Sequence, residues 1–464
     1  MTTATEGPAR PWTMPTLGDL LRLAWPVVVG RAAQSVVGFS DAALVASLGP
    51  DALAATSNGS MNALVLLMLP TGLVFIVQSF ASQLHGAGDR AGVRRYGWYG
   101  LAVAGLTQLV ALLALPLLPW ALGRLDYSAS VREQMTAFLA IRLLAAGAAV
   151  GIEALSNWFS GQERTGPGSV ANVVLMALNV PLNVWLIHGG LGVPALGVRG
   201  SALASVIATW FAFSLLLVRF WREGRGAEHP GWRREEFVRM LRFGLPSGVN
   251  WFLEFAAFLF FIDVVFARLG TVALAALMSV LQLNTVAFMP AFGVASAGAI
   301  QVGNALGARA HDRVPALVGR ATIVGCGWML AVGLSYALMP RLLLGIFARG
   351  AGAETEAMVS LGAQLLLVSV GWQLFDGLAM TVSEALRAAG DTAWPMWARI
   401  AIAWLFFVPA TMLTVRLGGG PVASLLWTVA YMALLAVLLN LRFRSGQWRH
   451  ISLTAPASDA PPVA

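Results

Sequence analysis

The segment LLRLAWP, residues 20–26, recurs later in the chain as MLRFGLP, residues 240–246. LGPDALAA at 48–55 likewise recurs as LGTVALAA at 269–276, and the two offsets are 220 and 221 residues. Further matches are residues 86–87 with 307–308 at an offset of 221, and Glu163 with Asp391, Pro167 with Pro395 and 180–181 with 408–409 at an offset of 228. This nearly constant offset indicates two halves of one architecture in parallel orientation. Parallel repeats are typical of transporters that work by alternating access around a central site.

The composition is that of a membrane protein. Hydrophobic residues make up 58% of the 464 residues, charged residues only 11%, and the mean hydropathy is +0.74. Stretches without any Asp, Glu, Lys or Arg, among them 52–88 and 269–308, exceed the ~20 residues that a transmembrane helix needs. We therefore predict an all-α integral membrane protein with about twelve transmembrane helices in two pseudo-symmetric six-helix lobes.

The repeat divides the chain into an N-lobe with helices 1–6 and a C-lobe with helices 7–12. Both ends of the chain are rich in Pro and Ala, and chain ends of this kind are commonly disordered. The predicted boundaries are 1–14 for a disordered cytoplasmic tail, 15–221 for the N-lobe, 222–234 for a cytoplasmic linker, 235–446 for the C-lobe and 447–464 for a second disordered cytoplasmic tail.

Arginine placement predicts the orientation. Arginines concentrate in alternate loops, such as 90–95 and 222–234, whereas the intervening loops hold fewer of them. The positive-inside rule then places both termini in the cytoplasm, in agreement with an even number of helices. We expect a monomeric, multi-pass protein of a bacterial-type inner (plasma) membrane.

Several functional classes lack their motifs in this sequence. All 30 basic residues are Arg and are dispersed over short loops, so the net charge of +8 does not indicate nucleic-acid binding. Without Lys there is no P-loop, and neither HExxH nor CxxC occurs. The single cysteine, Cys326, cannot form an internal disulfide. Since no nucleophile with its base is recognisable, we do not expect an enzyme, and we expect no cofactor.

Asp41 lies within a long apolar run, where a charged side chain is costly. In a helix, Arg31, Gln34, Gly38 and Asp41 fall on one stripe, at i, i+3, i+7 and i+10. Polar residues on such a stripe are expected to face the protein interior rather than lipid. Two interpretations of Asp41 remain open: a proton-responsive acid, or one partner of a buried ion pair with an arginine such as Arg142.

Two amides form a second polar feature of the first half. Asn179 and Asn183 are spaced i, i+4 around Pro181, and proline kinks a helix and frees a backbone carbonyl. Amides and a freed carbonyl on one face fit a proton-linked network with Asp41, or a cation site. Ordinary hydrogen bonding between helices is the equally weighted alternative.

Two acids of the second half interrupt the repeat. Glu254 has Asn250 at i, i+4, and Asp376 follows Trp372 by one turn. The corresponding positions of the first half are apolar or amide. We therefore expect Glu254 and Asp376 to be functional, with pairing to an arginine as the alternative.

Three further acids carry a weaker functional signal. Glu384 has Arg387 three residues later, a spacing that favours a surface ion pair. Asp263 lies nine residues from Glu254 and so on the opposite helix face. Glu153 has no evident partner in the sequence.

Six stretches carry a family resemblance. They are LLRLAWPVVVGRAAQSVVGFSDAALVASLG (20–49), ASQLHGAGD (81–89), LNVPLN (178–183), LRFGLPSGVNWFLEF (241–255), QVGNALGA (301–308) and EALRAAGDT (384–392). With these stretches, the sequence resembles the multidrug and toxic compound extrusion (MATE) family, and within it the NorM-type branch. The resemblance spans nearly all of residues 17–440.

The resemblance implies twelve helices in two lobes that form a V around a central cavity. It also implies export of organic cations and other drugs in exchange for H+ or Na+. Asp41 matches the family's first-helix acid, and Asn179 and Asn183 match its fifth-helix polar pair. Glu254 and Asp376 match the second-lobe acids of the NorM-type cation site, which makes them the candidate Na+ ligands; no firm metal site is indicated.

Three positions, Trp372, Arg31 and Asp263, depart from the family pattern. Some relatives have a tyrosine where Trp372 stands, one turn before Asp376, and tryptophan offers no oxygen to a cation. Arg31 adds a positive charge to the stripe of Asp41.

The sequence thus predicts a secondary antiporter that exports lipophilic organic cations by alternating access. The candidate cation-coupling residues are Asp41, Glu254 and Asp376, and the candidate substrate or proton network is Arg31, Gln34, Asn179, Asn183 and Asn250. The expected partners are small cationic drugs or metabolites and the lipid bilayer, with H+ or Na+ as coupling ion and no nucleic acid. The alternatives are a lipid-linked saccharide flippase of the same superfamily, with a strongly cationic cavity, and, more remotely, an intramembrane enzyme.

Overall fold

The computed structural model describes residues 13–124, 127–190, 192–224, 231–347 and 352–454. Within these ranges the regular structure is helical, apart from one isolated bridge between Gly190 and Val193. Ten of the helical segments are long and apolar enough to cross a membrane, and a bent pair with 46° between its halves adds an eleventh. The prediction of an all-α membrane protein is confirmed.

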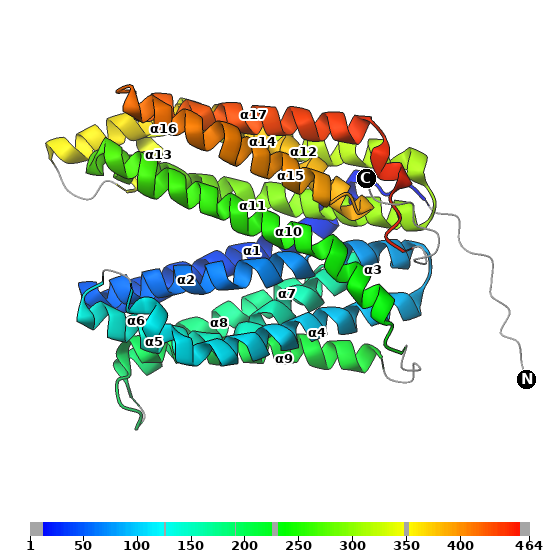
Figure 1. Cartoon of the computed structure of the whole chain (residues 1–464), viewed down its shortest axis with the longest axis horizontal. Coiled ribbons are helices and arrows are strands. Elements are labelled where there is room, and N and C mark those ends of the chain that lie inside the picture. Colours follow the sequence, from blue (N-terminus) through cyan, green and yellow to red (C-terminus); the bar gives the residue numbers. More distant parts are fainter. Residues whose placement is uncertain (1–12, 125–126, 191, 225–230, 348–351, 455–464) are drawn as a thin grey trace, which may run out of the picture.

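The N-lobe occupies the lower half of the molecule in Figure 1. Its helices are α1 (Leu17–Val45), α2 (Pro50–Val74), α3 (Ile76–Gly86), α4 (Arg90–Ala114), α5 (Leu118–Leu122), α6 (Ala129–Leu143), α7 (Ala146–Gly161), α8 (Gly166–His188) and α9 (Gly197–Glu223). The pairs α2 with α3 and α6 with α7 each form one membrane-spanning rod with a break. Counted in this way, the lobe has the six predicted rods.

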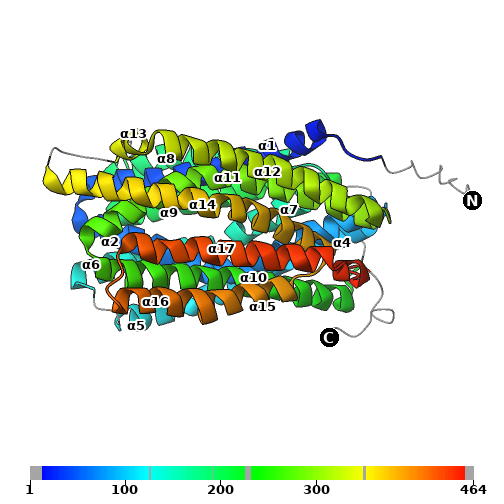
Figure 2. The ribbon, with the colours of Figure 1, turned by 90° about the horizontal axis from the view of Figure 1, so that it is seen from above.

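The C-lobe lies above it. Its helices are α10 (Arg234–Phe260), α11 (Thr271–Gly307), α12 (Val314–Leu338), α13 (Pro340–Gly345), α14 (Ala353–Ala389), α15 (Ala393–Ala401), α16 (Val408–Arg416) and α17 (Pro421–Arg444). The long helices run nearly parallel when the molecule is turned to show α17 in front (Figure 2). α10, whose first turns are charged, continues to Leu269 and is the rod that completes the set of twelve.

Two π-helical turns interrupt C-lobe rods at matching depth. Phe261–Val265 follows α10, and Ile402–Phe407 joins α15 to α16. The rings of Phe261 and Phe407 pack with their centroids 5.1 Å apart, so the two turns face each other. Turns of this kind are frequent near functional sites.

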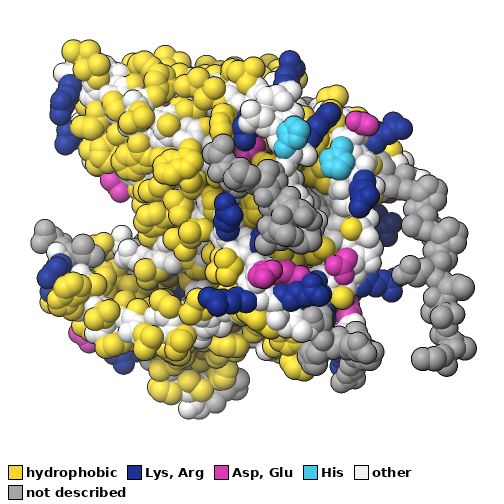
Figure 3. All heavy atoms as spheres, turned by 45° about the vertical axis from the view of Figure 1, so that its right-hand side comes forward, with side chains coloured by type: hydrophobic (Ala, Val, Ile, Leu, Met, Phe, Trp, Pro, Cys, Tyr) yellow, Lys and Arg dark blue, Asp and Glu magenta, His cyan; other side chains and the backbone are white. Residues whose placement is uncertain are grey.

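The first helix of each lobe packs against a helix of its own lobe and against a helix of the other lobe. α1 packs against α8 of its own lobe and α11 of the other, whereas α10 packs against α15 of its own lobe and α2 of the other. The lobes meet at the end where α1 begins and α17 ends, and they separate toward the opposite end (Figure 1). The space-filling view shows a deep hollow between the lobes at that opposite end (Figure 3).

The repeated Gly-Ala pairs, residues 86–87 and 307–308, lie at the contact between the lobes. A Cβ on Gly86 of α3 would lie 2.1 Å from the carbonyl oxygen of Asn304, and a Cβ on Gly307 of α11 would lie 1.8 Å from that of Gln83. Since only glycine lacks this atom, only glycine permits so close a backbone approach. The repeat therefore encodes a reciprocal contact that holds this end of the molecule closed.

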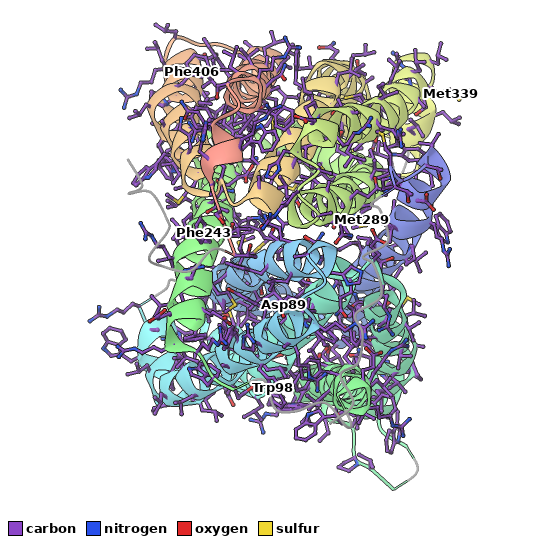
Figure 4. The ribbon with its side chains drawn as sticks, turned by 90° about the vertical axis from the view of Figure 1, so that its right-hand side faces the viewer. Asp89, Trp98, Phe243, Met289, Met339 and Phe406 are labelled. Atoms are coloured by element: carbon purple, nitrogen blue, oxygen red, sulfur yellow. The ribbon has the colours of Figure 1, made fainter. Side chains whose placement is uncertain are left out.

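Hydrogen bonds join the lobes beside this contact. The Gln83 side chain donates to the carbonyl oxygen of Ala388 at 2.7 Å, and the Asn304 side chain donates to a carboxylate oxygen of Glu163 at 2.7 Å. Viewed from this end, Met289 lies at the boundary between the lobes (Figure 4).

The ion pair of Glu384 with Arg387 forms as predicted, but it is not a surface pair. Arg387 is buried, and it also donates to the carbonyl oxygen of Phe75 in the other lobe at 2.8 Å and to Ser79 at 3.2 Å. Because buried charges require partners, this arginine needs both Glu384 and the N-lobe oxygens. The pair therefore belongs to the seam between the lobes.

The tail beyond α17 is folded as far as it is described. Gln447–His450 forms a short 3-10 helix, Trp448 is buried in the C-lobe core, and Leu453 is fully buried in the N-lobe core. The prediction of disorder from residue 447 is therefore wrong for residues 447–454, because two large apolar side chains anchor this segment across the seam. Residues 1–12 and 455–464, also predicted to be disordered, lie outside the described residues.

Candidate functional site

Asp41 is buried near the end of α1, and its carboxylate is held by neutral donors. Asn183 of α8 donates to one carboxylate oxygen at 2.7 Å, and Ser205 of α9 donates to the other at 3.2 Å. The three helices of one lobe thus converge on this carboxylate. Hydrogen bonds to a charged acceptor are stronger than those between neutral groups, so the donors compensate in part for burial.

The two amides predicted to act together do so. Asn183 donates to the side-chain oxygen of Asn179 at 3.0 Å, and Asn179 donates to Ser205 at 3.0 Å, which closes a ring with Asp41. Asn179 and Asn183 are fully buried. Among the described residues, the side-chain oxygen of Asn183 accepts no hydrogen bond. A buried acceptor without a donor is a place where a proton donor or a bound ligand can be received.

Arg142, at the end of α6, faces this network without touching it. It attracts Asp41 electrostatically, but the described residues include no salt bridge between the two side chains. The structure therefore does not give Asp41 the directly bonded arginine of the second interpretation. The carboxylate instead keeps neutral contacts and a cationic neighbour at a longer distance.

Arg31 and Gln34 lie on the same face of α1 as Asp41 but belong to another cluster. The two terminal nitrogens of Arg31 each donate a hydrogen bond to one carboxylate oxygen of Glu153, both at 3.1 Å. Gln34 donates to Glu153 at 3.1 Å and to Asn172 at 3.3 Å. At 1.5 Å of rise per residue, Arg31 is about 15 Å along the helix from Asp41. The guanidinium charge is therefore balanced by Glu153, the acid for which the sequence offered no partner.

The remaining member of the predicted stripe, Gly38, is exposed, and within the described residues no atom lies within 4 Å of the place of a Cβ. Arg31 and Gln34 meet side chains of α7 and α8, whereas Asp41 meets side chains of α8 and α9. The stripe therefore does not form one continuous buried surface.

In the C-lobe, Glu254 and Asp376 are brought together by a residue that the sequence analysis did not single out. Arg399 of α15 lies 2.5 Å from a carboxylate oxygen of Glu254 on α10. Asp376 of α14 interacts electrostatically with both, and so does Tyr431 of α17. The group therefore contains two acids, one guanidinium and one phenol from four helices.

Asn250 and Trp372 differ in their relation to this group. Asn250 and Arg399 line the same small cavity of about 40 Å³, and the side-chain oxygen of Asn250 accepts no hydrogen bond from the described residues. Trp372 is packed in the C-lobe core. The tyrosine of this region is Tyr431, supplied by another helix.

Arg399 stands out for the same reason as Asp41, because its charge is costly inside a membrane span. It is a charged residue within the apolar span Ala393–Arg416, and charged residues in such spans mark functional positions. Within the described residues there is no group of three or more His, Cys, Asp or Glu side chains arranged to hold a metal ion. The residues that could contact Na+ in the C-lobe are therefore Glu254, Asp376 and the free oxygen of Asn250.

A family model and several known proteins are similar to this chain over most of its length. The family model described as MatE matches residues 26–185 and 246–413. The probable multidrug resistance protein NorM of Bradyrhizobium diazoefficiens is 32% identical over 442 residues, 92% of each chain. The protein of the same name in Chromobacterium violaceum is 31% identical over 396 residues, 82% of this chain and 83% of the relative.

Solved structures share the fold. A crystal structure of MATE in complex with MaL6 superposes with a TM-score of 0.83 at 19% identity, covering 93% of this chain and 97% of the other. The outward-facing conformation of a multidrug resistance MATE family transporter of the MOP superfamily gives a TM-score of 0.80 at 18% identity, covering 93% and 96%.

Proposed function

Because this chain is a NorM-type member of the multidrug and toxic compound extrusion (MATE) family, we propose that it is an antiporter that exports lipophilic organic cations in exchange for protons. Its relatives are named as multidrug resistance proteins, which supports a multidrug efflux transporter over an enzyme. Our proposal concerns the identity of the substrates, the coupling ion and the residues that couple the two.

The hydrogen-bond ring around Asp41 carries the proposal. The carboxylate has neutral donors from Asn183 and Ser205, with no directly bonded arginine among the described residues. Its negative charge is therefore free to attract a cation, and a proton on the same oxygen cancels that attraction. Arg31 supports this assignment as well, because it lies about 15 Å along the helix from Asp41 and is already paired with Glu153.

Coupling follows if the two ligands prefer different states of the transporter. A ligand shifts a conformational equilibrium only by its differential affinity for the two states. We propose that the cationic drug binds while Asp41 is deprotonated and that the proton, entering from outside, releases it. The protonated carboxyl then returns through the cycle to the inside.

The orientation is part of the proposal. The arginine-rich loops belong to the end where α1 begins and α17 ends, and the positive-inside rule assigns that end to the cytoplasm. The hollow between the lobes then opens to the outside of a bacterial-type inner membrane. This arrangement corresponds to the state in which substrate leaves and a proton enters.

Proton movement measured in the absence of a preset gradient tests the proposal. Ethidium would be added to proteoliposomes that carry a pH-sensitive dye, and the pH change would be recorded for the wild-type chain, for Asp41→Asn and for Asp263→Asn. The last variant makes the same change at an exposed position and serves as the control. We expect ethidium to drive proton movement in the wild type and in the Asp263 variant only. Proton movement that persists in Asp41→Asn would contradict the assignment.

A further inference from the structure

Arg399 is ion-paired with Glu254 and interacts electrostatically with Asp376, the two acids that the family resemblance identifies as candidate Na+ ligands. Its guanidinium lies 2.5 Å from Glu254, and it attracts Asp376 as well. The Arg399 side chain is only 15% exposed and that of Glu254 is 33% exposed, so bulk water screens the pair poorly. Each component comes from a different helix, α15, α10 and α14, and the arrangement is therefore a product of the fold.

The charge of Arg399 is permanent. A guanidinium does not lose its proton in proteins, and it cannot accept a hydrogen bond or coordinate a metal. Any metal ion that approached Glu254 would meet a fixed positive charge, and this repulsion is strong where the surroundings are poor in water. Arg399 is thus an internal cation that cannot leave by diffusion.

The surrounding ligands do not compensate for this repulsion. Hard cations are bound by several oxygens at once, usually from carboxylates, carbonyls and water. Here the guanidinium holds Glu254, and Trp372 is packed in the apolar core. The other side-chain oxygens of this group are those of Asp376, the second carboxylate oxygen of Glu254, the hydroxyl of Tyr431 and the oxygen of Asn250, which accepts no hydrogen bond from the described residues.

The N-lobe contains a comparable ion pair. Arg31 is bound by both carboxylate oxygens of Glu153, and Gln34, which completes that cluster, stands 220 residues before Glu254. The repeat relates only one helix of each pair, α1 with α10; Glu153 lies on α7, whereas Arg399 lies on α15, the counterpart of α8 at the offset of 228. Among the described residues, Asp41 has no directly bonded guanidinium.

We infer that Arg399 is a tethered cation that excludes Na+ from the Glu254 and Asp376 group, and that it is the residue that selects H+ over Na+ as the coupling ion. The link to coupling rests on the function proposed above. The exclusion of Na+ is a binding property of the folded chain and stands independently of transport.

Direct binding of radioactive Na+ to the purified full-length chain in nanodiscs tests this inference without any transport step. Na+ would be varied at constant ionic strength with choline as the replacement. We expect no saturable Na+ binding to the wild type or to Arg399→Lys, which retains the charge. Arg399→Gln removes the charge and should bind one Na+ per chain, and the double variant Glu254→Gln with Arg399→Gln should again bind none.

Two results would overturn the inference. One is saturable Na+ binding to the wild type that Glu254→Gln abolishes, because Arg399 would then coexist with the ion. The other is a folded Arg399→Gln chain that binds no Na+, because the guanidinium would then not be the cause of exclusion. Neither result depends on whether the chain transports ethidium, so failure here is distinguishable from failure of the proposed function.

Arg399→His provides a variant in which Glu254 and Asp376 are not left permanently without a positive partner. Its imidazole is charged at about pH 5.5 and neutral at about pH 8.5. We expect the Arg399→His chain to bind Na+ at the higher pH only. Glu254, Asp376 and Tyr431 are the titratable groups that act on this position, and their own protonation also changes with pH. Na+ binding to Arg399→Gln, measured at both pH values, corrects for that change. Equal binding by Arg399→His at both pH values, after that correction, would contradict the inference.

Discussion

Asn183 donates a hydrogen bond to Asp41 at 2.7 Å, while its own side-chain oxygen has no donor among the described residues. One amide therefore fixes the carboxylate and leaves an acceptor beside it. When Asp41 is protonated, the new O–H is a donor next to an unused acceptor. This relationship makes the pair suited to holding either a charge or a proton.

Asn183→Ala should impair coupling. A hydrogen bond to a charged group contributes roughly 1.5–3 kcal/mol, so we expect proton-driven ethidium efflux to fall by about tenfold. Asn58→Ala is a matched control, because among the described residues the Asn58 side chain donates only to the carbonyl oxygen of Ala54 in its own helix. Efflux of the Asn183 variant equal to that of the control would show that the bond to Asp41 does not matter.

Arg31→Met should destabilise the N-lobe through Glu153. The substitution removes both hydrogen bonds to a carboxylate whose side chain is only 12% exposed, and we expect a loss of about 2 kcal/mol in unfolding free energy. Adding Glu153→Gln should restore most of that loss, since the acid no longer needs a counter-charge. Thermal unfolding of the single and double variants measures both effects, and simple additivity of the two changes would argue against the pairing.

The residues that hold the N-lobe clusters could be predicted only in part. The spacing of Asn179 and Asn183 places them on one helix face, and the structure joins them to Asp41. The partner of Arg31 could not be predicted, because Glu153 lies 122 residues away on another rod. Sequence spacing reports contacts within a helix, whereas contacts between helices depend on how the rods pack.

Gly307→Ala should weaken the closed end of the molecule. The added carbon would lie 1.8 Å from the carbonyl oxygen of Gln83, so α3 and α11 must move apart. We expect spin labels on the two lobes at this end to show longer distances than in the wild type. Gly105→Ala makes the same change in α4, where no atom of the described part of the chain lies within 4 Å of the new carbon, and should leave the distances unchanged.

The contrast between the helices and the tail shows where composition misleads. α8 begins and ends at residues that the sequence marks, because a proline stands near its start and a glycine follows its end. The tail from residue 447 was expected to be disordered from its overall Pro and Ala content. Two apolar residues inside it, Trp448 and Leu453, decide otherwise by entering the cores of different lobes.

Leu453→Asp should release this tail from the N-lobe. The side chain is fully buried there, and Arg239 donates to the carbonyl oxygen of Leu453 at 3.5 Å. An unpaired carboxylate cannot replace a buried leucine, so we expect faster proteolysis of the tail and a lower unfolding midpoint. Thr454→Asp places the same charge at the next, exposed position and should match the wild type.

Arg399 is the C-lobe site residue that is hardest to identify from the sequence, and it has the largest effect on what the site is expected to bind. Its position inside a predicted helix was visible in the sequence, but its contact with Glu254 requires α15 and α10 to pack together. The resemblance to the family supplied the two acids as candidate Na+ ligands. The guanidinium that pairs with Glu254 changes what these two acids are expected to bind.

The most direct test of the account is ethidium efflux from proteoliposomes with a proton gradient or a sodium gradient imposed separately. We predict that the proton gradient alone drives efflux by the wild-type chain, that the sodium gradient alone does not, and that Asp41→Asn abolishes the proton-driven component. Efflux driven by sodium alone, or proton-driven efflux that survives Asp41→Asn, would contradict it.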